Sequence, residues 1–104
     1  MIDLKEFKNL LEKSGLPVAY REFPKNDAPE LPFICYNETG TNNFPADGIV
    51  YHVTNQIDVE LYTKIKDLEV EDKVEKALSS FFWNKTETYL DDEMCFQIVY
   101  ELEV

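Results

Sequence analysis

Apolar residues near the N-terminus recur every three or four positions, which is the spacing of one face of an α-helix. Asp3 precedes this segment as a helix cap, and the segment stops at Gly15, with Pro17 just beyond. The apolar positions are Leu4, Phe7, Leu10 and Leu11. The spacing predicts a short amphipathic helix at the start of the chain.

Two short strands are predicted next, with a polar loop between them. Residues 18–23 can form one strand, and residues 33–36 are apolar on both faces, as expected for a short covered strand. Three prolines, together with Asn26 and Asp27, break regular structure between the strands and indicate a surface loop. Residues 37–43 predict a second, turn-rich loop, which is a candidate contact surface.

Strict alternation of apolar and polar residues marks the middle of the chain. Ile57, Val59 and Leu61 alternate with Asp58, Glu60 and Tyr62, which predicts a strand with one buried and one wet face. Residues 49–53 precede it as a second strand, with the polar pair Thr54 and Asn55 between the two. The pattern predicts a β-hairpin that turns at this polar pair.

A second helix is predicted to follow Asp67. Its first turn carries Glu69 and Glu71, which are favourable charges at the positive end of the helix dipole. Apolar residues then recur at helical spacing, in a stripe expected to face a sheet. The stripe consists of Val70, Val74, Ala77, Leu78 and Phe81.

The C-terminal segment predicts two more strands, residues 86–90 and 94–104, joined by an acidic turn at residues 91–93. The last strand alternates between an apolar face and a face that becomes more polar toward its end. The whole pattern predicts one α+β domain over residues 1–104. Its mostly antiparallel sheet has about five strands, with two α-helices packed on one face.

Composition and charge limit the partners of such a domain. The chain is 44% hydrophobic and 13% aromatic, which is typical of a folded protein. Its 21 acidic and 10 basic residues give a formal charge of −11, which repels phosphate backbones and anionic membranes. We therefore expect no tight nucleic-acid binding and no membrane association. The absence of a long apolar run and of a signal-peptide pattern favours synthesis in the cytosol.

Residues with catalytic potential are few. The single histidine, His52, has no second ligand at metal-binding spacing, so a sheet-surface position is expected. Cys35 and Cys95 lie in apolar segments without a CxxC spacing, which indicates reduced core residues. Acidic pairs on one strand face are expected by chance among 21 acids, and no glycine-rich phosphate loop is present. We expect no enzyme activity, no cofactor and no metal.

Aromatic and polar residues at strand edges and in loops are the candidates for protein contacts. Tyrosine is enriched where an interface buries one end of a ring, although ordinary half-buried sheet tyrosines explain the same pattern. The candidate interaction residues are Asn26, Asp27, Tyr36, Asn42, Phe44, Tyr51 and Tyr62. Both interpretations of the aromatic residues remain open at this point.

The middle of the chain also carries a family pattern. It consists of Asn-Phe-Pro-Ala-Asp-Gly at residues 43–48, Tyr51, Glu-Leu-Tyr-Thr at 60–63, Lys66-Asp67 at the helix start and the closing segment 96–101. Together with the N-terminal helix and the strand after Pro32, it resembles small tail-completion or tail-terminator proteins. These proteins are encoded by long-tailed phages and prophages of low-GC Gram-positive bacteria.

The resemblance covers most of the chain and implies a structural role. It implies an α+β subunit that assembles as a ring, commonly a hexamer, at the head–tail interface of the virion. The ring would cap the tail tube and dock the head, so the implied partners are further copies, the major tail-tube protein and a head-completion protein. The resemblance implies no catalytic residues. It does not map the ring interfaces residue by residue, so the predicted loops at residues 25–30 and 38–43 are only candidate contact regions.

Two other classes of function remain open. One is a different head–tail connector, an adaptor or a minor capsid protein, which the position of the gene would distinguish. The other is a small acidic regulator or inhibitor that occupies a basic site, including by DNA mimicry. An enzyme with an unrecognised site ranks last.

Overall fold

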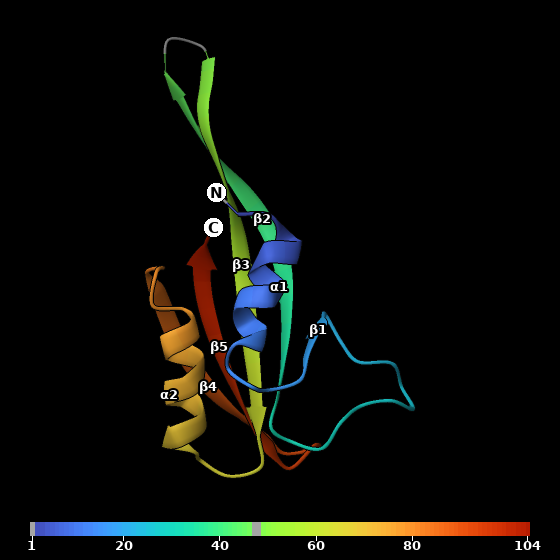
Figure 1. Cartoon of the computed structure of the whole chain (residues 1–104). Helices are drawn as coiled ribbons and strands as arrows, with labels where there is room; N and C mark the ends of the chain where they lie inside the picture. Colours follow the sequence, from blue (N-terminus) through green and yellow to red (C-terminus); the bar gives the residue numbers. More distant parts are fainter. Residues whose placement is uncertain (1, 47–48) are drawn as a thin grey trace.

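The computed structural model describes residues 2–46 and 49–104, with side chains for residues 2–42 and 53–104 (Figure 1). Five strands form one sheet in the order β1-β2-β3-β5-β4. β1 runs parallel to β2, and the other neighbours are antiparallel. The elements are α1 (Leu4–Glu12), β1 (Val18–Tyr20), β2 (Phe33–Ala46), β3 (Ile49–Thr63), α2 (Leu68–Ala77), β4 (Trp83–Leu90) and β5 (Cys95–Glu103). The predicted α+β class with a mostly antiparallel five-stranded sheet is confirmed.

Both helices begin where the sequence predicts. The Asp3 side chain accepts a hydrogen bond from the backbone N–H of Glu6 at 2.8 Å, and α1 follows it. The Asp67 side chain accepts one from the N–H of Val70 at 3.2 Å, and α2 follows. Beyond α1 the chain passes through Gly15 at φ +83°, a conformation that glycine adopts without a Cβ clash. Local capping therefore determines where each helix starts.

The predicted alternation along the middle strand is also confirmed. Ile57, Val59 and Leu61 of β3 are buried, whereas the residues between them are half-buried. On the buried side β3 lies opposite core residues of its neighbours β2 and β5. The core formed there includes Ile34, Tyr36, Ile57, Val59, Leu61, Ile98, Tyr100 and Leu102 of the sheet, with Phe7, Leu11, Val74 and Leu78 of the helices.

The contacts of both helices fall on this same side of the sheet. Phe7 of α1 makes an edge-to-face contact with Tyr36 of β2, with ring centroids 6.0 Å apart. Glu75 of α2 accepts a hydrogen bond from the Tyr100 hydroxyl of β5 at 2.8 Å. Figure 1 shows the two helices in front of the strands, α1 over β2 and β3 and α2 over β4 and β5. Phe7 of α1 also makes an edge-to-face contact with Phe81, four residues beyond the end of α2, with ring centroids 5.9 Å apart.

Two predicted features of the middle segment are wrong. Residues 37–43 form part of β2 and not a loop, and Thr54 and Asn55 lie inside β3 and not in a turn. The backbone of Asn55 exchanges two hydrogen bonds with Val104, at 2.8 and 2.9 Å, which holds it in an extended conformation. The hairpin is therefore formed by β2 and β3, and residues 47 and 48, which connect the two strands, lie outside the described residues.

Smaller differences affect strand ends. β1 stops at Tyr20, before the predicted end at Phe23, because Arg21 adopts a left-handed backbone conformation with φ +65°. β4 starts at Trp83, three residues earlier than predicted. The predicted acidic turn between the last two strands is confirmed, and it closes through Met94 at φ +54°.

The distal half of the β2–β3 hairpin extends beyond the rest of the sheet. β5 pairs with β3 only from Gln56 onward, and β1 pairs with β2 only as far as Tyr36. Residues 41–46 and 49–54 therefore form a two-stranded arm, which projects at the top of Figure 1. Six residues of strand correspond to about 20 Å. The arm accounts for the elongated shape of the molecule, which measures 50 × 28 × 26 Å.

Replacement of Phe7 with alanine tests the packing of α1. The Phe7 ring is fully buried between Tyr36 and Phe81, so Phe7→Ala leaves a cavity between α1, β2 and the segment that follows α2. We expect the free energy of unfolding to fall by about 3–5 kcal/mol, measured by urea denaturation. Lys8→Ala, an exposed neighbour on the same helix, should change it by less than about 0.5 kcal/mol. Equal losses for the two variants would contradict this packing.

Candidate functional site

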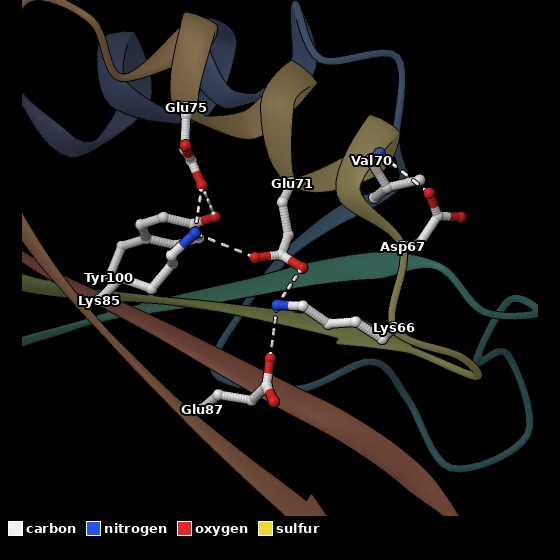
Figure 2. A network of polar contacts seen from close by, with 8 residues as sticks. All are labelled: Lys66, Asp67, Val70, Glu71, Glu75, Lys85, Glu87 and Tyr100. Carbon is white, nitrogen blue, oxygen red and sulfur yellow. Dashed lines mark hydrogen bonds and ion pairs between the residues drawn. The ribbon is translucent and has the colours of Figure 1, made fainter.

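A network of charged side chains links α2 to the sheet (Figure 2). Glu71 of α2 is 2% exposed, and its two carboxylate oxygens meet two lysines from different parts of the chain. Lys66, just before α2, lies 2.7 Å from Oε2, and Lys85 of β4 lies 3.0 Å from Oε1. A buried carboxylate is costly unless it is paired in this way. Pairing with the two lysines therefore allows the Glu71 side chain to be buried between α2 and the sheet.

The network continues on both sides of Glu71. The Lys85 ammonium also donates to Glu75 at 2.8 Å, and Glu75 accepts from the Tyr100 hydroxyl. Lys66 contacts Glu87 of β4 at 2.6 Å. Figure 2 shows the resulting chain of contacts from Glu87 to Tyr100. The Lys85 ammonium also lies over the ring of Tyr100, 5.9 Å from the ring centroid.

The pKa values of these groups follow from their contacts. Burial alone would raise the pKa of Glu71, but hydrogen bonds and charge attraction from Lys66 and Lys85 lower it below its ordinary value. The pKa of Lys85 is raised, chiefly by its hydrogen bond to Glu75. The pKa of Lys66 is raised, chiefly by its hydrogen bond to Glu71. All three groups are thus held in their charged forms at neutral pH.

The contacts of this network join α2 to the sheet, and its charged groups do not resemble a catalytic centre. A general acid or base needs a pKa near the working pH, whereas these shifts move the groups away from it. Within the described residues, no group of three or more His, Cys, Asp or Glu side chains is arranged to hold a metal ion. The network joins α2 to β4 and β5, and we interpret it as structural.

The opposite face of the sheet is a second candidate site. Among the described residues, neither helix contacts it, and it presents rows of mainly polar side chains across four strands. One row runs Asn37, Asp58, Glu101 and Asn84, as the strand register shows. We call this surface the open face. Burial, and then the nearby charge of Glu101, raise the pKa of Asp58 above its ordinary value.

The open face contains a hollow of about 530 Å³ at its end next to the arm. Glu103 lines this hollow and accepts hydrogen bonds from Asn42 and, at 3.1 Å, from Thr54. These contacts tie β5 to the base of the arm. The residues that line the hollow include three acids, Asp58, Glu101 and Glu103, and no basic residue among the side chains described there. The hollow suits a positively charged partner and repels phosphate.

The predicted interaction residues are spread over the molecule. Asn26 and Asp27 are exposed in the loop between β1 and β2, and Asn42 is at the base of the arm, where it contacts Glu103. Phe44 and Tyr51 belong to strands of the arm, and their side chains lie outside the described part of the structure. Three of the seven residues, Asn42, Phe44 and Tyr51, thus belong to the arm, and those whose side chains are described do not form one patch.

The two predicted tyrosines that are described have different surroundings. Tyr36 is 4% exposed and packs between Phe7 and Tyr20, so the expectation that it is exposed for contacts is wrong. Tyr62 is half-buried on the open face; its hydroxyl donates to Glu60 at 2.8 Å and accepts from Gln97 at 2.9 Å. Burial, followed by the hydrogen bond to Glu60, raises the pKa of Tyr62.

The cysteines occupy the positions that the sequence predicts. Cys35 and Cys95 are both free thiols, and both are buried. Burial, with the charges of Glu60 and Glu22, raises the pKa of Cys35 to about 11, so the thiol is protonated and unreactive at neutral pH. His52 lies in β3 of the arm, and its side chain is outside the described part of the structure.

The Glu71 network was not predicted. The sequence placed Glu71 only as a favourable charge in the first helical turn, and Lys66 and Lys85 had no assigned role. A signal was present, because Glu71 lies three residues before Val74 and seven before Leu78, on the buried side of α2. An acid on an apolar stripe indicates a buried ion pair.

Comparisons with known proteins add no family assignment: no protein-family model and no curated protein matches this chain. In the described part of the chain, no helix has the length and apolar character needed to cross a membrane.

Removal of the buried charge tests the network. Glu71→Gln leaves Lys66 and Lys85 without their shared carboxylate, and we expect the free energy of unfolding at pH 7 to fall by about 1–3 kcal/mol. Because the folded-state pKa of Glu71 is lower than its unfolded value, its stabilisation is present above the unfolded pKa. It is lost as the pH falls through the folded-state pKa.

The variant should therefore differ most from the wild type near neutrality and least in acid. Urea denaturation from pH 7 down to about pH 3 measures this difference, since it spans the ordinary glutamate pKa. Glu69→Gln is the matched control, because Glu69 is exposed in the same helical turn. A difference for Glu71→Gln that stays constant with pH would show that Glu71 is not ion-paired.

Proposed function

We propose that this protein is a structural component of a phage virion, a tail terminator or tail-completion protein without enzymatic activity. Copies assemble as a ring, commonly a hexamer, which caps the tail tube and joins it to the head connector. Its partners are further copies of the chain, the major tail-tube protein and a head-completion protein. The proposal places the protein at the head–tail interface.

The projecting arm is the observation that carries this proposal. A two-stranded ribbon is at best marginally stable by itself, so packing against another protein chain would stabilise it. The described segments 43–46 and Tyr51, which belong to the family pattern, lie in this arm. The arm thus combines the residues behind the resemblance with a shape that favours protein assembly.

The charge distribution supports the same role. A ring at the head–tail interface must let DNA pass without holding it, and phosphate binding depends on lysine and arginine contacts. The open face instead carries Asp58, Glu60, Glu101 and Glu103, and the chain as a whole has a formal charge of −11. Such a surface disfavours retention of DNA.

Shortening the arm tests the proposal directly. Thr41 and Asn55 are register partners, so a two-residue Asn-Gly turn between them can replace residues 42–54. This variant keeps all the pairs between β3 and β5 and the whole core. We expect it to remain folded, by circular dichroism and thermal melting, but to lose binding to the tail-tube protein, measured by co-sedimentation with assembled tubes.

The wild-type protein is the positive control and should sediment with the tubes and, with them, form a ring visible by negative-stain electron microscopy. A shortened protein that binds tubes as tightly as the wild type would show that the arm is not the contact. A wild-type protein that stays monomeric at high concentration and does not bind tubes would overturn the proposed function.

The acidic open face favours one second candidate, a small regulator or inhibitor that occupies a basic, DNA-binding site. The hollow lined by Asp58, Glu101 and Glu103 would be its contact surface. This candidate predicts that the protein competes with DNA for a host nuclease or repressor. The tail-terminator proposal predicts no such competition, so a fluorescence displacement assay with labelled DNA distinguishes the two.

A further inference from the structure

The outer edge of β4 has the features of a pairing surface. β4 is the last strand of the sheet, and among the described residues no strand pairs with its outer side. Its eight residues pair with β5 in an uninterrupted register, without a bulge, and the strand contains no proline. Bulges, prolines and free charges are the usual means by which proteins protect an edge strand from pairing. β4 lacks the first two.

Free charge is also scarce along this edge. The only charged residues of β4 are Lys85 and Glu87, and both point toward the helices, where they contact Glu71, Glu75 and Lys66. The side chains on the open-face side of the strand are neutral: Asn84, Thr86 and Thr88. The internal network therefore holds the charges that could otherwise repel an approaching strand.

Exposed aromatic residues lie near both ends of the strand. Phe82, one residue before β4, is fully exposed and lines the hollow on the open face. Tyr89, at the other end, is 46% exposed. Aromatic side chains that remain exposed to solvent in the isolated chain are typical of protein interfaces.

The sequence of β4 is complementary to itself when two copies run antiparallel. A twofold axis places one residue of the strand opposite its own copy. With Lys85 or Glu87 on the axis, like charges would face each other, which is unfavourable. With Thr86 on the axis, Lys85 of each copy lies opposite Glu87 of the other.

The same register matches the remaining residues. Asn84 lies opposite Thr88, and Thr86 opposite Thr86, which are pairs that can exchange hydrogen bonds. Trp83 lies opposite Tyr89, and the exposed Phe82 lies opposite Leu90. Each end of the contact therefore has one aromatic pair, Trp83 with Tyr89, on the helix-covered face of the sheet. It also has one apolar pair, Phe82 with Leu90, on the open face.

We propose that two copies of this protein pair through the outer edges of β4, with Thr86 on the twofold axis, and form one continuous ten-stranded sheet. The partner is a second copy because the strand is complementary to its own sequence in hydrogen bonding and apolar contact, and because this register brings no like charges opposite each other. This dimer joins identical surfaces, whereas a cyclic ring joins unlike ones, so it is a separate state of the free protein. It does not rest on the proposed tail function.

Cysteine cross-linking tests the register. Residues on the axis have Cβ atoms about 5 Å apart, so Thr86→Cys should form a disulfide between copies on mild oxidation. Thr88→Cys is the matched control, since its two copies would be separated by four residue steps, about 13 Å, beyond disulfide reach. Cys35 and Cys95 are buried, so the wild-type protein should not cross-link. Non-reducing electrophoresis measures the product.

Charge at the axis tests the association itself. Thr86→Lys places two ammonium groups opposite each other in the dimer, while the exposed side chain leaves the monomer intact. We expect the dimer dissociation constant to rise about tenfold or more, measured by sedimentation velocity. Thr88→Lys, which would face neutral Asn84, should raise it less.

Circular dichroism establishes that all four variants are folded. A wild-type protein that is monomeric at millimolar concentration would overturn the proposal, as would disulfide formation by Thr88→Cys in preference to Thr86→Cys. An unchanged dimer in Thr86→Lys would also overturn it. None of these results bears on tail-tube binding, which depends on the arm and is measured separately.

Discussion

The alternation of side chains along β3 is the constraint on which the rest of the structure depends. Residues 57, 59 and 61 supply the centre of the apolar core, and a shift of one residue would place acids there instead. Both helices contact the apolar side, so the acids of the same strand lie on the open face. One local pattern thus produces a structural side and a side available for contacts.

The Glu71 network adds a polar element to the apolar side. Glu71 is almost completely buried, and its cost is offset because Lys66 and Lys85 reach it from two directions. The same contacts orient Lys85 and Glu87 on β4 toward α2. The other face of this edge strand carries the neutral side chains of Asn84, Thr86 and Thr88.

Much of the fold could be predicted because its signals are local. Asp3 and Asp67 cap helices within three residues, and the alternation in β3 and β5 needs only each strand itself. The arm could not be predicted in this way, because residues 37–43 contain Asn, Thr and Gly without a period of two. Their strand conformation comes from backbone pairing with β3, a partner up to about twenty residues away. Tyr36 was misjudged for a related reason: a short segment that is apolar on both faces does not indicate which face the helices cover.

The candidate sites were harder to predict than the fold. Glu71 and Lys85 are fourteen residues apart and meet only when α2 lies on β4, and the self-complementarity of β4 matters only because the strand is at an edge. Both depend on the order of strands, which the local patterns do not contain. The proposed role in tail assembly combines a sequence resemblance with a shape, the projecting arm.

Tail length in a phage that lacks this gene is the most direct test of that role. Negative-stain electron microscopy of lysates with and without the protein measures it. The proposed function predicts that tails without the protein lack a uniform length, extend beyond the normal tube and do not join heads, and that supplying the protein restores uniform tails. Tails of normal length joined to heads in the absence of the protein would contradict it.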